Sequence, residues 1–390
     1  MAQYNRGHLW KLRKYEHTER SAWLDDFHWA PEKGERQRLR EETKLKSELD
    51  ALGTEWQKIL RIVEWVHHLP SEADGGSEGT NNHNAFYLLL GGLSGEVPFR
   101  CVEFGFMLNH TLSAFGFPSR VVTIMQKECE QGIGRAHVLT DVWCNDFNKW
   151  IAVDAALNQY YCDQAGNILS AIELRKLVRE ARWSDIIGSR ESAIRNEYAV
   201  WGPGQTKEDC RFDEIFVPEG FTREEMWDSL RDTRDFECYW KYLLSLYYHV
   251  AWSTKHSLIE PLPQNSLSTI FLCDSKEMPP IVFQSIRRQL TFTCESARVN
   301  FPINGVEVRW QLVHEGQAVD SIEKAQEIML VLRQSMPWFS HYQVRIGERE
   351  FLQEENFIPV RLKIGETRIE ITPINDCNRI GRTAYLTVVV

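Results

Sequence analysis

Hydrophobic residues recur at helical spacing along the first part of the chain. Within the charge-rich stretch 32–52, Leu39, Leu45, Leu49 and Leu52 predict a partly exposed helix. A second helix is expected over 54–69, where an apolar stripe runs until Pro70 ends it. The stretch 72–84 is rich in Gly, Ser, Asp and Asn, so we expect a loop there, which is a candidate for a mobile flap.

The pattern changes from helix to strand in the middle of the chain. Apolar residues on one stripe predict a helix over 100–115, with Gly116 and Pro118 as its stop and Cys101 in its first turn. Short β-branched runs predict strands at 120–125, 136–144 and 150–154. We therefore expect an antiparallel sheet packed on the helix that bears Cys101.

The last part of the chain contains a helical region followed by strands. Helical periodicity with many aromatic residues returns over 168–258, and the composition shifts near Pro261. Beyond it, strands are predicted at 269–273, 290–294, 306–313, 342–346, 359–364, 367–372 and 384–390, whereas 322–333 fits either a helix or a strand. The expected fold is α+β, with a first domain over 1–260 that has N-terminal helices and a helical extension. A β-sandwich of immunoglobulin-like type is expected over 261–390.

Composition restricts the class of protein. The 390 residues are 43% hydrophobic and 26% charged, as in folded globular chains. The formal net charge of −10 disfavours nucleic acid and anionic membranes as partners. We expect no membrane span, because no run approaches about 20 apolar residues. The nine cysteines lack the close spacing of a disulfide framework, and no signal-peptide core opens the chain, so a cytoplasmic location is expected.

Three residues far apart in the chain could form a nucleophilic site. Exposed amides at a helix N-terminus favour an anion, so Cys101 is placed to form a reactive thiolate. Its base would be His137, at the start of the strand 136–144. If 145–146 form a two-residue turn, His137 lies directly opposite Asp154; if 145–148 form the loop, Asp154 is the diagonal neighbour on the same face. Either register lets the imidazole and the carboxylate meet.

Four runs of sequence resemble the transglutaminase-like superfamily: 99–104, 114–122, 137–143 and 149–154. The Cys, His and Asp of that superfamily match Cys101, His137 and Asp154, at spacings of 36 and 17 residues. The resemblance implies a papain-like or transglutaminase-like core in which Cys101 is the nucleophile, His137 relays the proton and Asp154 orients His137. It implies an oxyanion site formed by the Cys101 N–H and a side chain of the preceding segment, for which Asn84 is the candidate.

These features predict a cysteine-dependent acyl hydrolase or acyltransferase. An amide or ester of a protein, peptide or small molecule would form a thioester at Cys101, and water or an amine would resolve it. The sequence departs from the superfamily pattern at Phe99, at residues 138–139 and at Ala155, which motivates the alternative of a catalytically silent scaffold that binds a protein partner. A metal-dependent hydrolase with Cys101 and His137 as ligands is a third hypothesis. No Cys-x-x-Cys or His-Glu-x-x-His spacing supports it, so neither a metal nor a cofactor is expected.

Overall fold

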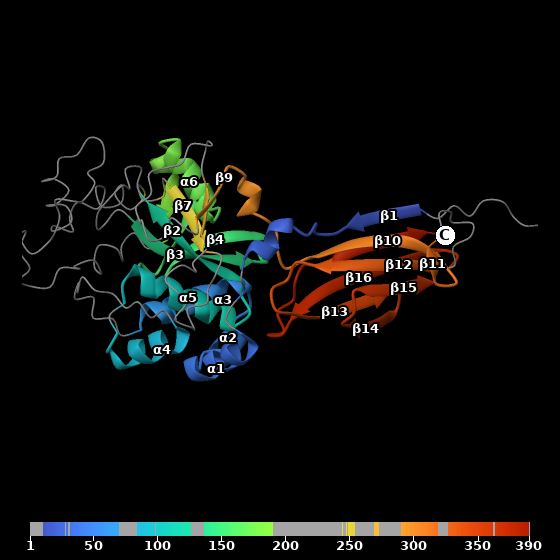
Figure 1. The fold of residues 1–390 in the computed structure, drawn as a ribbon, viewed down its shortest axis with the longest axis horizontal. Coiled ribbons are helices and arrows are strands. Elements are labelled where there is room, and N and C mark those ends of the chain that lie inside the picture. Colours follow the sequence, from blue (N-terminus) through green and yellow to red (C-terminus); the bar gives the residue numbers. More distant parts are fainter. Residues whose placement is uncertain are drawn as a thin grey trace, which may run out of the picture. The chain divides into compact units, whose positions relative to one another are not determined.

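The computed structural model describes residues 11–69, 84–125, 136–189, 244–253, 269–272, 290–318 and 327–389, apart from 28, 30, 31, 98, 245, 246, 248 and 362. Helices and largely antiparallel sheets make up this part of the chain, so the expected α+β class is confirmed (Figure 1). The chain divides into two compact units, one formed by Met1–Asp25 with Phe301–Val390 and the other by Asp26–Asn300.

The first unit contains two antiparallel sheets. The five-stranded sheet has the order β1-β17-β16-β13-β14, with bounds Lys11–Glu16, Ala384–Val389, Glu366–Asn375, Phe339–Ile346 and Arg349–Gln353. The four-stranded sheet has the order β11-β10-β12-β15, with bounds Gln317–Ala318, Val306–His314, Glu327–Gln334 and Phe357–Arg361. Alternating burial along β12 and β16 directs one face of each sheet into a shared hydrophobic cluster. The stretch 322–333, which fitted either element, is a strand from Glu327 onward.

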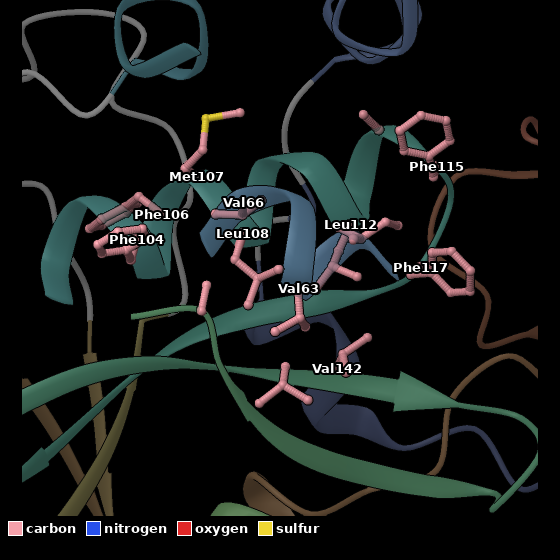
Figure 2. Close-up of a cluster of buried hydrophobic side chains, with 14 of the residues drawn as sticks. Val63, Val66, Phe104, Phe106, Met107, Leu108, Leu112, Phe115, Phe117 and Val142 are labelled. Carbon is pink, nitrogen blue, oxygen red and sulfur yellow. The ribbon is translucent and has the colours of Figure 1, made fainter. Parts of the chain in front are cut away.

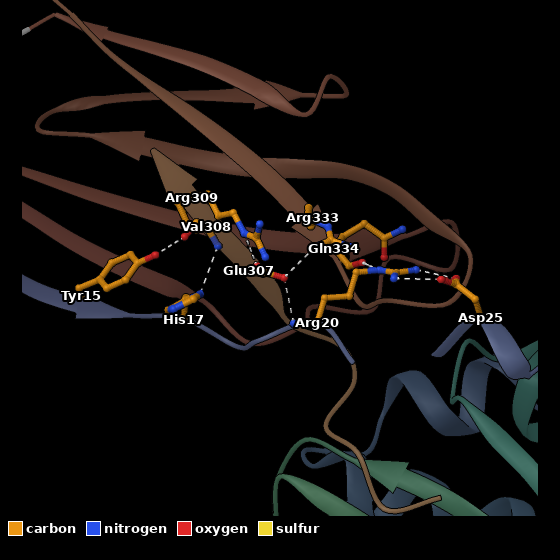
Figure 3. A network of polar contacts seen from close by, with 9 residues as sticks. All are labelled: Tyr15, His17, Arg20, Asp25, Glu307, Val308, Arg309, Arg333 and Gln334. Carbon is orange, nitrogen blue, oxygen red and sulfur yellow. Dashed lines mark hydrogen bonds and ion pairs between the residues drawn. The ribbon is translucent and has the colours of Figure 1, made fainter. Parts of the chain in front are cut away.

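Residues 11–25 belong to this β unit, which corrects the expected first domain of 1–260. Strand β1 pairs with β17 at the other end of the chain. Side chains of β1 and of the residues that follow it also bond to the C-terminal strands of this unit (Figure 3). The Tyr15 hydroxyl donates to the Val308 carbonyl, the Val308 N–H donates to His17 Nδ1 at 3.3 Å, and Arg20 Nε donates to the Gln334 carbonyl at 3.0 Å. A sequence pattern gives no sign of such a pairing, because the two strands are joined by no local turn.

The second unit begins with helices. Their bounds are Lys33–Thr43 (α1), Lys46–Asp50 (α2), Glu55–His67 (α3), Ala85–Ser94 (α4), Cys101–Ala114 (α5) and Ala171–Arg179 (α6). The helices predicted over 54–69 and 100–115 are confirmed, whereas the one over 32–52 is interrupted at Lys44, which adopts a left-handed φ of 57°. Short 3-10 helices cover Ala22–Asp26, Trp183–Asp185 and Ser296–Arg298.

An eight-stranded sheet completes the second unit, in the order β6-β5-β4-β3-β2-β7-β8-β9. The bounds are Ile186–Gly188, Gln159–Asp163, Lys149–Asp154, Ala136–Cys144, Ser119–Met125, His249–Ser253, Thr269–Leu272 and Leu290–Thr293. All described pairs are antiparallel except β8 with β9.

This sheet corrects two expectations. Residues 249–253 form a strand where a helix was predicted. The prediction was wrong because a short buried apolar run has the same hydrophobic pattern in a helix and in a strand. Strands β8 and β9 extend the sheet of β7, so they belong to this unit and not to the C-terminal sheets. The predicted border at 260/261 therefore moves to 300/301. Residues 190–243, which hold most of the predicted helical extension, lie outside the described residues.

Helix α5 is the buried centre of the second unit, and every residue after Val102 in it is buried. Figure 2 shows its apolar side chains, such as Leu108 and Leu112, beside Val63 and Val66 of α3 and Val142 of β3. Gly105 lets the helix approach β3 closely, since a Cβ there would stand 2.8 Å from Cγ1 of Val138. The Thr140 hydroxyl donates to the Gly105 carbonyl at 3.0 Å and fixes the same contact.

We predict that Gly105→Ala destabilises the protein. The added methyl group clashes with Val138, and overpacking of this kind costs about 1–3 kcal/mol, more than the roughly 1 kcal/mol that alanine contributes to a helix over glycine. Gly34→Ala in exposed helix α1 is the matched control, because a Cβ there meets nothing within 4 Å, and it should be neutral or slightly stabilising. Urea unfolding measures both. Equal midpoints for the two variants would contradict the close packing of α5 on β3.

Candidate functional site

Cys101 is the first residue of α5 and is partly exposed, whereas the helix is buried from Glu103 onward. The local sequence starts the helix at this point, because Glu103 accepts the backbone N–H of Arg100 at 3.0 Å and the Phe104 N–H donates to the Arg100 carbonyl at 3.0 Å. Gly116, with a φ of 78°, follows the helix at its other end, as predicted. The thiol therefore lies at the positive end of a long helix.

His137 and Asp154 meet across strands β3 and β4. The ladder pairs Cys144 with Lys149 and Thr140 with Val153, which is the register of the four-residue loop 145–148. In that register Asp154 is the diagonal neighbour of His137 on the same face. His137 Nε2 and Asp154 Oδ2 are 2.6 Å apart, and both side chains are buried.

The loop between β3 and β4 is anchored to helix α3. Glu55 accepts the backbone N–H of Asn145 at 2.8 Å and its side-chain amide at 3.0 Å. In return, the Asp146 carboxylate accepts the Trp56 N–H at 2.9 Å, one of the helix amides that lack an intrahelical acceptor. The polar groups of the helix N-terminus and of the loop thus hydrogen-bond to each other. These bonds hold the strand register that brings His137 to Asp154.

Both oxygens of Asp154 are hydrogen-bonded. One binds His137, and the other accepts the backbone N–H of Leu157 at 3.2 Å, from the turn that follows β4. The carboxylate is fully buried, so these two donors replace the water it would have in solution. The bond to Leu157 also fixes the plane of the carboxylate toward the imidazole.

The imidazole connects the carboxylate to the thiol. Burial alone would raise the pKa of Cys101, but a hydrogen bond and the positive charge of His137, with the Val138 N–H, outweigh burial and lower it. Burial would likewise lower the pKa of His137, yet the charge and hydrogen bond of Asp154 and the contact with Cys101 raise it well above its usual range. Because Nε2 is held by Asp154, Nδ1 is the ring nitrogen left for the sulfur. The environment favours a thiolate–imidazolium pair.

Two tyrosines and a glutamine near Asp154 did not stand out as site residues in the sequence. Burial raises the pKa of Tyr161 and of Tyr247, and the nearby charge of Asp154 raises both further. Their rings pack edge to face at 5.4 Å. Gln159 lies directly opposite Asp154 on β5 and is 1% exposed. A hairpin with the four-residue turn 155–158 could have placed Gln159 opposite Asp154, but Tyr247 comes from a segment almost a hundred residues later.

Arg120 forms a structural ion pair on the sheet. Its Nη2 is 3.2 Å from Asp141 Oδ2, and the guanidinium lies 3.8 Å from the centre of the Trp150 ring. Burial lowers the pKa of Arg120 to about 10, although the charge of Asp141 opposes the shift. Trp252 Nε1 donates to Asp141 Oδ2 at 2.6 Å, so the cluster ties β7, β2, β3 and β4 together on the face that carries His137.

Asn84 serves as the N-cap of α4. Its Oδ1 accepts the backbone N–H groups of Phe86 and Tyr87 at 3.0 and 3.2 Å. The structure therefore gives this residue a capping role, and its role at an oxyanion stays a prediction. Residues 72–83 of the candidate flap lie outside the described part of the chain.

Cys144 differs from Cys101 in its surroundings. It is fully buried, and burial raises its pKa to about 12. This is an inert core thiol. Among the described residues, no group of three or more His, Cys, Asp or Glu side chains could hold a metal ion. Nor does a helix in the described ranges have the length and apolar character to cross a membrane.

Comparison with known proteins gives no further assignment: no family model matches the chain, and no curated protein matches it.

We predict that Cys101 reacts faster with iodoacetamide at neutral pH than Cys294, an exposed thiol that serves as the reference. The physical reason is the lowered pKa of Cys101, which raises its thiolate fraction. His137→Ala should slow the labelling of Cys101 by about tenfold, as a rise of one pKa unit requires, and should leave Cys294 unchanged. Peptide mapping by mass spectrometry after limited labelling measures each site. Similar rates at Cys101 and Cys294, with no effect of the substitution, would contradict the coupling.

Proposed function

We propose that the chain is a cysteine-dependent acyl hydrolase or acyltransferase with Cys101 as the nucleophile, His137 as the proton carrier and Asp154 as the group that orients His137. The observation that supports this most strongly is the position of the His137 imidazole, which lies 2.6 Å from a buried carboxylate and close enough to the Cys101 thiol to lower the pKa of that thiol. An ordinary strand histidine needs neither partner.

The reaction proceeds through a thioester. The Cys101 thiolate attacks the carbonyl carbon of an amide or ester, and a carbon–sulfur bond forms while the carbonyl π electrons move to oxygen. As the tetrahedral intermediate collapses, the bond to the leaving nitrogen or oxygen breaks, and His137 gives that atom its proton. Water or an amine then attacks the thioester, His137 takes up the proton, and the thiolate leaves. Asp154 stays ionised and stabilises the imidazolium throughout.

The geometry agrees with a papain-like or transglutaminase-like core, in which a helix that begins with the nucleophilic cysteine packs on an antiparallel sheet that carries the base and its carboxylate. The two sheets of the first unit would then be an accessory β-sandwich. The substrate would be a protein, a peptide or a small amide. The oxyanion would be bound by the Cys101 N–H and by the amide nitrogen of Asn84.

We predict that p-nitrophenyl acetate acylates Cys101. Wild-type protein should release nitrophenol and gain one acetyl group, which peptide mapping places on Cys101. Cys101→Ala should abolish both signals, and Cys294→Ala, the control at an exposed thiol, should abolish neither. Adding a primary amine to the acylated enzyme separates the two outcomes, because an acyltransferase forms the amide and a hydrolase forms acetate.

The same experiment can also contradict the proposed nucleophile. Nitrophenol release and acetylation that persist unchanged in Cys101→Ala, or a wild type that neither releases nitrophenol nor gains an acetyl group at Cys101, would leave a catalytically silent scaffold as the better account of this chain.

A further inference from the structure

His67 connects the end of helix α3 to the strand that carries Asp154. It is the last residue of α3, and its Nδ1 lies 2.9 Å from the carbonyl oxygen of Ala155, the residue that follows Asp154. A carbonyl oxygen only accepts hydrogen bonds, so Nδ1 carries the proton and donates. The contact joins residues 88 positions apart in the chain.

The Ala155 carbonyl belongs to the turn that orients Asp154. It also accepts the Asn158 N–H at 3.3 Å, which closes the turn, and Asn158 adopts a left-handed φ of 48°. Inside this turn, the Leu157 N–H donates to Asp154 Oδ1 at 3.2 Å. A donor that fixes the first carbonyl of the turn therefore also fixes the amide that holds the carboxylate.

His67 reaches the helix of the nucleophile as well. Its ring is stacked against Phe104, with ring centres 6.4 Å apart and planes 29° apart. Phe104 lies in the first turn of α5, three residues after Cys101, and it is buried. The His67 side chain thus contacts both the turn after Asp154 and the first turn of α5. These two segments must keep their relative positions for the thiol, the imidazole and the carboxylate to meet.

We propose that His67 is a positioning residue for the site: its hydrogen bond to Ala155 sets the turn that presents Asp154 to His137. The inference rests on the proposed function of Cys101, His137 and Asp154. Without the bond, the carboxylate is less well aligned, the imidazolium is less stabilised, and the thiolate of Cys101 is less favoured.

The test is the pH profile of Cys101 alkylation by iodoacetamide in full-length variants. For His67→Ala we expect the apparent pKa of the reaction to rise and labelling at neutral pH to slow roughly 2- to 10-fold, the range of one net hydrogen bond. For His67→Asn we expect a profile close to wild type, since the Asn amide nitrogen occupies about the position of the histidine Nδ1. His67→Gln places its amide nitrogen near the Nε2 position instead, and it should resemble His67→Ala.

His68 provides the matched control. It is the next residue, and its Nδ1 lies 2.7 Å from the carbonyl of Glu64 in its own helix, so it does not reach the Asp154 turn. His68→Ala should retain the wild-type profile. Circular dichroism identifies the folded variants, and the comparison of His67→Asn with His67→Gln tests the bond even where His67→Ala does not fold.

The outcomes separate this inference from the proposed function. Wild-type Cys101 that reacts no faster than Cys294 would overturn both. Two other outcomes would overturn only the role of His67, given a reactive wild type. In one, His67→Ala keeps the wild-type pH profile. In the other, His67→Asn and His67→Gln slow the labelling of Cys101 equally.

Discussion

A buried carboxylate is costly unless hydrogen bonds replace its hydration, and Asp154 obtains them from His137 and from the Leu157 amide. The site depends on this pairing. It holds the imidazole in one orientation and raises its pKa, and the imidazole in turn lowers the pKa of the Cys101 thiol. Removing the carboxylate would leave an imidazole whose burial disfavours its charged form, and the thiolate would lose its counterion.

The surrounding fold keeps these three groups together through contacts far from the sulfur. Gly105 and Thr140 fix the depth of α5 on β3, and Glu55 fixes the loop that sets the register of β3 with β4. The cluster around the Arg120–Asp141 ion pair holds four strands of the same sheet together. These contacts join different helices and strands, so the site is a property of the second unit and not of any one motif.

Much of the site could be predicted from sequence because its signals are local. Gly116 and Pro118 mark the end of α5, which places Cys101 near its start, and strand alternation with a short loop limits His137 and Asp154 to two registers that both allow contact. The remainder depends on contacts that no local pattern encodes. The pairing of β1 with β17 and the bond from His67 to Ala155 each join distant segments. Strand β7 was expected to be helical, because a buried apolar strand lacks a distinctive period.

The most direct test of the coupled site is a titration of the thiolate by its ultraviolet absorbance, with the Cys101→Ser spectrum subtracted at each pH. Our account predicts that the pKa of Cys101 lies below that of a free cysteine thiol measured in the same buffer, and that Asp154→Asn moves the transition upward. Ionisation of Cys101 at or above the pKa of the free thiol, with no response to Asp154→Asn, would contradict the account.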